Sequence, residues 1–171
     1  MGDRKARGPM DYIHQRHPSH KEGLIMSDDA GLDPGRFLEA QRESFVHAIA
    51  ELKCGQKRGH WMWFIFPQLA GLGRSPTARH YALRSADEAR AYLAHPIRGE
   101  RIRVAARAVL THPNRSLADI FGYPDDLKFW SSMTLFAIIA AETDGDPFRR
   151  ALDMFCDGMF DPATMDLLLA H

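Results

Sequence analysis

From Asp33 onward, apolar residues recur every three or four positions, which is the spacing of one face of an α-helix. The first such segment runs from Phe37 to Leu52, and Gly55 is well placed to end it. The segments Ile97 to Thr111 and Asp125 to Glu142 show the same period. The second of these is apolar on more than one side, which is typical of a helix in the middle of a bundle. The pattern therefore predicts an all-α fold.

Recurring start signals divide this pattern into separate helices. At five places a residue that can cap a helix precedes a proline, and proline is favoured at the first position of a helix. These pairs are Asp33-Pro34, Ser75-Pro76, His95-Pro96, Asp146-Pro147 and Asp161-Pro162. Shorter helices are predicted over Ser85 to Leu93, Ser116 to Phe121, Phe148 to Cys156 and Ala163 to Leu169. We expect about seven or eight helices in a single compact bundle.

The beginning of the chain lacks the helical pattern. Residues 1–31 are polar and rich in Gly, Pro, His, Lys and Arg, so we predict a flexible N-terminal extension before a domain that spans residues 32–171. Three evenly spaced histidines, His14, His17 and His20, are a pattern that can bind a transition metal. We favour the simpler interpretation of a polar tail that contains histidines, and we predict no metal site.

One stretch inside the domain also departs from the helical period. The run from His60 to Gly73 contains two of the three tryptophans and six consecutive apolar residues, Trp61 to Phe66. Its composition is that of a buried strand. A strand needs a partner for its backbone groups, however, and nowhere else does the chain offer a convincing segment of period two. We therefore predict a short helical turn or an irregular segment threaded between helices.

Three stretches carry a resemblance to a known family. They are His60 to Gly73, Glu88 to Pro96 and Lys128 to Phe136. Together they resemble the bacterial domain-of-unknown-function family 1810, over about Phe37 to Leu169. The resemblance implies an all-α fold and a small stand-alone intracellular protein, and it implies no established activity. Trp130 stands where we expect a basic residue more often in that family.

Charge and composition exclude several classes of function. Lys and Arg together number 22, as do Asp and Glu, so the formal net charge is zero and the basic excess of a nucleic-acid-binding protein is missing. No apolar run is long enough to cross a membrane. The two cysteines lack the spacing of a metal or redox site, and no signal peptide is recognised. We expect a cytoplasmic protein without a nucleic-acid or membrane partner, and we predict no cofactor.

Polar side chains around the aromatic run are the first candidates for chemistry. Lys57 and His60 can bind a phosphate or carboxylate, and His60 can transfer a proton because its unperturbed pKa lies close to neutrality. Trp61 and Trp63 can stack on a planar ligand. Gln68 needs hydrogen-bond partners if it is buried, which makes it a further candidate for ligand binding. The alternative is that both tryptophans belong to the core and that His60 bonds a backbone carbonyl.

A second group of candidates lies on the most apolar predicted helix. Ser131 and Ser132 follow Lys128 at three and four residues and share a helix face with it. A lysine beside a serine can activate a nucleophile or bind an oxyanion, so Lys128 and Ser132 are candidate catalytic groups. Small hydroxyls that allow close helix packing are an equally good interpretation. Arg79, which follows a glycine loop, is a candidate anion clamp.

Two functions fit these residues. The first is a pocket that binds, and in an enzymatic version turns over, a small anionic ligand that is nucleotide-like or phosphorylated. It would combine the His60 to Gly73 motif with the helix around Lys128 to Thr134. The second is a protein-interaction module that presents the aromatic run to a partner, and it requires Trp61 or Trp63 to be exposed. The sequence leaves the oligomeric state open.

Overall fold

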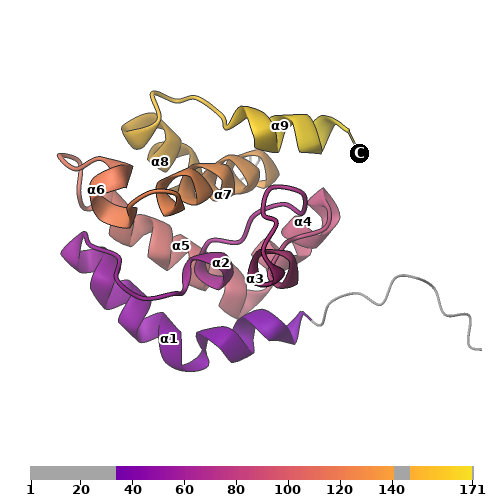
Figure 1. The fold of residues 1–171 in the computed structure, drawn as a ribbon, viewed down its shortest axis with the longest axis horizontal. Helices are drawn as coiled ribbons and strands as arrows, with labels where there is room; N and C mark the ends of the chain where they lie inside the picture. Colours follow the sequence, from indigo (N-terminus) through magenta and orange to yellow (C-terminus); the bar gives the residue numbers. More distant parts are fainter. Residues whose placement is uncertain (1–33, 141–146, 171) are drawn as a thin grey trace, which may run out of the picture. The chain divides into compact units, whose positions relative to one another are not determined.

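The computed structural model describes residues 34–140 and 147–170. Within these residues the chain forms nine α-helices and no strand, which confirms the predicted all-α fold (Figure 1). Their bounds are α1 Gly35–Cys54, α2 Met62–Ile65, α3 Pro76–His80, α4 Ala86–Ala94, α5 Pro96–Leu110, α6 Leu117–Phe121, α7 Asp125–Ile139, α8 Pro147–Phe155 and α9 Pro162–Leu169. None of these helices is both long and apolar enough to cross a membrane.

The helix boundaries follow the predicted caps closely. The Ser85 hydroxyl accepts a hydrogen bond from the Glu88 N–H at 3.1 Å and so caps α4. His95 ends α4 and caps α5, because its Nδ1 accepts from the Ile97 N–H at 3.2 Å. Gly55 ends α1 in the left-handed conformation at φ 69°. Short side chains and glycine therefore fix these ends by local hydrogen bonds and backbone geometry.

The structure contains more helices than the seven or eight predicted. The additional helix is α2, a four-residue turn where a short helical turn or an irregular segment was predicted, whereas the five-residue α3 begins at the predicted start Ser75-Pro76. Such single turns carry too few residues to show a hydrophobic period, so the sequence pattern does not separate them from a loop. The predicted extension over residues 1–31 and the caps Asp33 and Asp146 lie outside the described residues. So does the predicted end of α7 at Glu142.

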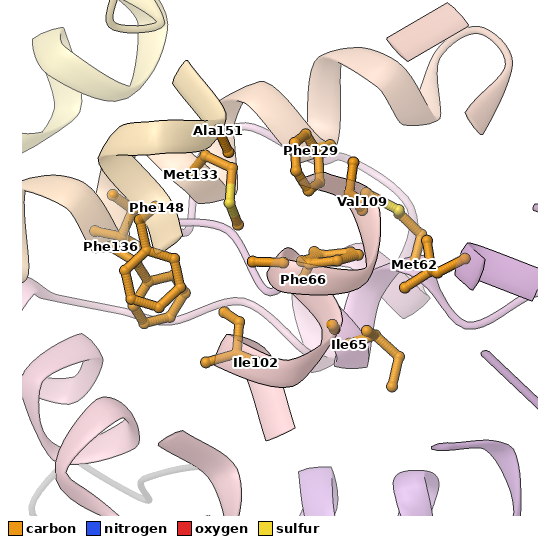
Figure 2. Close-up of a cluster of buried hydrophobic side chains, with 14 of the residues drawn as sticks. Met62, Ile65, Phe66, Ile102, Val109, Phe129, Met133, Phe136, Phe148 and Ala151 are labelled. Atoms are coloured by element: carbon orange, nitrogen blue, oxygen red, sulfur yellow. The ribbon is translucent and has the colours of Figure 1, made fainter. Parts of the chain in front are cut away.

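The hydrophobic core lies where α5 and α7 meet their neighbours. The helix α5 packs against α1, α4 and α8, and α7 packs against α4, α6, α8 and α9. Figure 2 shows Phe66 among side chains from these helices, including Ile102 of α5 and Phe129 of α7. The rings of Phe66 and Phe129 meet edge to face with their centroids 4.9 Å apart. The aromatic run is thus anchored in the centre of the fold.

The aromatic run itself is a short helix flanked by irregular segments, as predicted. Its backbone groups find partners on neighbouring elements instead of on a strand. The buried Gln41 of α1 donates a hydrogen bond to the carbonyl of Phe64 at 2.6 Å. A single parallel bridge joins Leu69 to Leu83, and it is the nearest approach to a sheet among the described residues. The irregular segment is therefore held in place by long-range contacts.

Candidate functional site

The turn after α1 carries Lys57 into the fold. The left-handed Gly55 ends α1, and its N–H donates to the carbonyl of Leu52 at 3.0 Å. Two residues later, the Lys57 N–H donates to the carbonyl of Ile120 in α6 at 2.7 Å. The segment between α1 and α2 is thereby fixed against α6, and only 9% of the Lys57 side chain is exposed.

Asp125, the first residue of α7, joins two lysines from different parts of the chain. Lys57 Nζ lies 2.8 Å from its Oδ2, and Lys128 Nζ lies 2.7 Å from its Oδ1. Burial raises the pKa of the Asp125 carboxyl, but the hydrogen bonds and charges of Lys128 and Lys57 outweigh burial and hold the pKa below its usual value. The carboxylate is therefore ionised at neutral pH. We call these three residues the lysine–aspartate cluster.

Each lysine of the cluster also lies over a tryptophan ring. Lys57 Nζ is 5.1 Å from the ring centroid of Trp61, and Lys128 Nζ is 4.7 Å from that of Trp63. An ammonium group at these distances is attracted by the electron-rich face of the ring. Lys57 also donates to the carbonyl of Gly59 at 2.6 Å, so its partners lie within the protein. Lys128 is 23% exposed and Trp63 is half-buried, so this side of the cluster reaches solvent.

Trp61 is held in the core by its indole N–H. The side chain is 3% exposed, and its Nε1 donates to Glu51 Oε2 at 2.9 Å. The same oxygen accepts the N–H groups of Arg58 and Gly59. Burial raises the pKa of Glu51, but these three hydrogen bonds and the charge of Lys57 together lower it below its usual value. Trp61 is therefore a buried residue that packs against Lys57 of the cluster, and its indole N–H has a hydrogen-bond partner in Glu51.

His60 faces a different part of the surface. It is exposed and lines a shallow hollow of about 330 Å³ together with His47, Glu43 and Trp61. Within the described residues, no hydrogen bond joins its imidazole to the lysine–aspartate cluster. Trp61 lines this hollow and also contacts Lys57 of the cluster.

The two candidate serines are buried in helix packing. The Ser131 hydroxyl lies 2.6 Å from the Thr164 hydroxyl of α9. Ser132 is fully buried, and its hydroxyl has no hydrogen-bond partner in the part of the chain that the structure describes. Nor does any hydrogen bond there join Lys128 to either serine. The predicted shared face is thus divided: Lys128 contacts Asp125 and Trp63, while Ser131 contacts α9.

Gln68 and Arg79 lie on the segments that follow α2. Gln68 is half-buried, and its carbonyl accepts the N–H of Leu83 at 2.8 Å next to the parallel bridge. Arg79 is exposed on α3, which begins at the cap Ser75. No hydrogen bond or ion pair among the described residues connects Gln68 or Arg79 to the lysine–aspartate cluster.

Two acidic residues, Asp125 and Glu51, contact the candidate residues that the sequence indicates. Neither Asp125 nor Glu51 is itself among those candidate residues. The position of Asp125 three residues before Lys128 is a local signal for the ion pair between them. No local signal connects Lys57 to Asp125 or Glu51 to Trp61. Within the described residues, no group of three or more His, Cys, Asp or Glu side chains is arranged to hold a metal ion.

Comparisons with known proteins agree on the fold and assign no chemistry. A family model described as "Protein of unknown function (DUF1810)" matches residues 32–168. The crystal structure of the conserved hypothetical protein Rv1873 from Mycobacterium tuberculosis is 44% identical in sequence, with a TM-score of 0.77. The match covers 81% of this chain and 97% of that protein. None of the curated proteins matches the sequence.

Proposed function

The chain belongs to the DUF1810 family of unknown function, and we propose that it binds a small anionic ligand, nucleotide-like or phosphorylated, at the lysine–aspartate cluster. The observation that carries this proposal is the convergence of two lysines on Asp125, each lying over the ring of a tryptophan of the aromatic run. The site would be formed by the His60 to Gly73 motif and the beginning of α7.

The charges of the cluster favour an anion. Two ammonium groups share one carboxylate, which leaves one positive charge in excess. Glu51, whose pKa is lowered partly by the charge of Lys57, balances that excess on the buried side, so Lys128 is the ammonium group that reaches solvent and that an external anion can approach. A partly desolvated ammonium group is stabilised by an additional anionic partner. A phosphate or carboxylate oxygen would supply that partner.

The two lysines are suited to different tasks. Lys57 has Asp125, the Gly59 carbonyl and the Trp61 ring as partners, and it is almost buried. We infer that it orients Asp125. Lys128 has three N–H donors, of which Asp125 accepts one, and its side chain reaches solvent. Lys128 is therefore the group that would contact the ligand.

Trp63 supports a ligand with a planar part. Its ring is half-buried and lies under Lys128, so a group that contacts the ammonium would approach the edge or face of the indole. Stacking of a base on an aromatic side chain contributes about 1 to 3 kcal/mol. A nucleotide combines such a planar group with a phosphate.

The geometry supports binding better than turnover. Of the three candidate catalytic groups, His60 faces a separate hollow and Ser132 is buried within the helix packing. Lys128 is paired with Asp125. The alternative function, a protein-interaction surface formed by the aromatic run, has less support, because Trp61 is only 3% exposed and Trp63 is half-buried.

A thermal-shift experiment tests the proposal, with inorganic phosphate, pyrophosphate, AMP and ADP as probes. A ligand present at about 100 times its Kd stabilises the folded state by about 2.7 kcal/mol, which raises Tm by several degrees. We expect at least one probe to produce such a shift in the wild type. Lys128→Met, which replaces the ammonium group by an uncharged, unbranched side chain, should abolish this shift.

Lys53→Met is the matched control, because Lys53 is exposed in the last turn of α1. It should leave the shift unchanged. The proposal fails if none of the four probes raises Tm, or if Lys128→Met responds as strongly as the wild type does.

A further inference from the structure

A second feature, which the proposed ligand site does not involve, is an open apolar groove formed by α6, α7 and the end of α8. Its volume is about 380 Å³, within the usual range for sites that hold a ligand or a large side chain. It is lined by Leu117, Asp126, Leu127, Trp130, Phe155, Cys156, Asp157 and Met159. Most of this lining is apolar.

Two of the apolar side chains that line the groove are largely exposed to solvent. Leu127 is 48% exposed and Met159 is 62% exposed. These two are among the seven exposed large apolar side chains of the described residues, and both lie in the groove lining. Exposed apolar side chains that share one groove mark an interaction surface more often than isolated ones do.

Hydrogen bonds fix the residues that line the groove. The Trp130 indole N–H donates to the carbonyl of Met159 at 2.8 Å, which fixes the ring that forms one wall. The turn after α8 is fixed as well, because the Gly158 N–H donates to the carbonyl of Leu152 at 3.0 Å and the Met159 N–H to that of Cys156 at 2.8 Å. A surface fixed in this way loses little conformational entropy when it binds a partner.

The charged residues of the groove are both acidic. Asp126 and Asp157 line it, and no basic residue among those that the structure describes does. Neither carboxylate takes part in an ion pair within the described residues. Cys156 behaves as part of the apolar wall, because burial and the charge of Asp157 raise the pKa of its thiol to about 11. An occupant of matching chemistry would place an apolar group in the groove and a positive charge at its rim.

We propose that this groove docks a short segment of another protein that carries one large apolar side chain flanked by Lys or Arg. The apolar side chain would lie against Leu127 and Trp130, where a single buried anchor supplies most of the binding energy. The flanking cations would approach Asp126 and Asp157. These rim charges mainly set the choice of partner and the rate of association.

Selection from a random peptide display library on the full-length protein tests this proposal. We expect enriched sequences to share a large apolar residue next to Lys or Arg. Binding of an enriched peptide, measured by fluorescence anisotropy, should weaken at least tenfold in Leu127→Glu. Because Leu127 is half-exposed, this variant should remain folded, which circular dichroism will verify. Met159→Ala, at an exposed position, should weaken binding in the same direction.

Two matched changes separate the groove from general surface effects. Val46→Glu places the same charge at a 73% exposed position of α1 and should leave binding unchanged. The double variant Asp126→Asn with Asp157→Asn should weaken binding severalfold at low salt and less at high salt. The proposal is overturned if no sequence is enriched, if enriched flanks are acidic, or if Leu127→Glu binds equally well. A dimer that is seen in sedimentation of the wild type and that dissociates in Leu127→Glu would also overturn it, because a second copy of the chain would then cover the groove.

Discussion

The first two turns of α7 carry two different surfaces. Asp125 and Lys128 belong to the lysine–aspartate cluster, whereas Asp126, Leu127 and Trp130 line the apolar groove. Successive residues of an α-helix are rotated by about 100°, so these two sets project in roughly opposite directions. One short stretch of helix therefore contributes both to the proposed ligand site and to the proposed docking groove.

The contrast between these surfaces lies in where their partners come from. Asp125 is mostly buried and has two lysines from the same chain as partners. A charge in that position must be paired within the protein, because an uncompensated buried charge is strongly destabilising. Asp126 and Leu127, on the other side, have no ion pair with any residue that the structure describes, and both remain accessible. The cluster thus contributes to the fold, while the groove is available to another molecule.

The largest expected effect distinguishes the two neighbouring aspartates. Asp125→Asn removes the negative charge between Lys57 and Lys128, and we expect it to lower the free energy of unfolding by about 2 to 3 kcal/mol. The same change at Asp126 should alter it by less than about 0.5 kcal/mol, because that carboxylate has no ion pair in the described residues. Urea denaturation measures both values. Equal losses in the two variants would contradict the assignment of Asp125 to the interior.

A smaller effect should appear in the dependence of stability on pH. The folded-state pKa of Asp125 is below its unfolded value of about 3.9, so its contribution is fully present above that value. It is lost as the pH falls through the lowered pKa, when the carboxylate becomes protonated. The wild type should therefore lose stability between about pH 5 and pH 2, and Asp125→Asn should lose less.

Denaturation midpoints measured across this range check the sign. Asp126→Asn is again the control, and its profile should follow that of the wild type. A profile of Asp125→Asn that is as steep as the wild-type profile would assign the acid sensitivity to other carboxyl groups, such as Glu51.

The smallest expected effect is spectroscopic and compares the three tryptophans. In variants that retain one tryptophan each, Trp61 should be the best protected from soluble quenchers, because it is 3% exposed. Trp63 and Trp130 are both half-buried, but their charged neighbours differ in sign. Iodide should quench Trp63 beside Lys128 more efficiently than Trp130 beside the acidic rim. Caesium should show the opposite preference, since local potential concentrates ions of opposite charge.

The ratio of iodide to caesium quenching is the quantity to compare, because it cancels the exposure of each ring. Acrylamide, which is uncharged, provides the reference. Equal ratios for Trp63 and Trp130 would mean that the two sides of α7 do not differ in potential.

Much of the fold was predictable because helix ends depend on nearby residues. Ser85, His95 and Ser116 each cap a helix through a backbone N–H two or three positions away. The composition of the aromatic run, together with the lack of a pairing strand, also predicted a short turn at α2. The family resemblance was confirmed by the match over residues 32–168. The two shortest helices were not separable from loops by their period.

The site was predictable only in its parts. Lys57, Trp61, Trp63 and Lys128 were identified from their residue types, and the structure joins all four through Asp125 and the two ring contacts. The helical period placed Ser132 on the same face as Lys128. It could not show that α9 packs against this part of α7 and encloses the serines, since that contact involves residues far along the chain.

The helical architecture, the caps and the burial of the aromatic run can all be inferred from the order of residues along the chain. These features follow from hydrogen bonds within one turn and from periods within one helix. The tertiary structure alone decided that Lys57 meets Asp125, that Ser131 meets Thr164 and that Leu127 is left uncovered. Each of these depends on how separate helices pack, because burial and charge pairing are set by neighbours in space and not by neighbours in sequence.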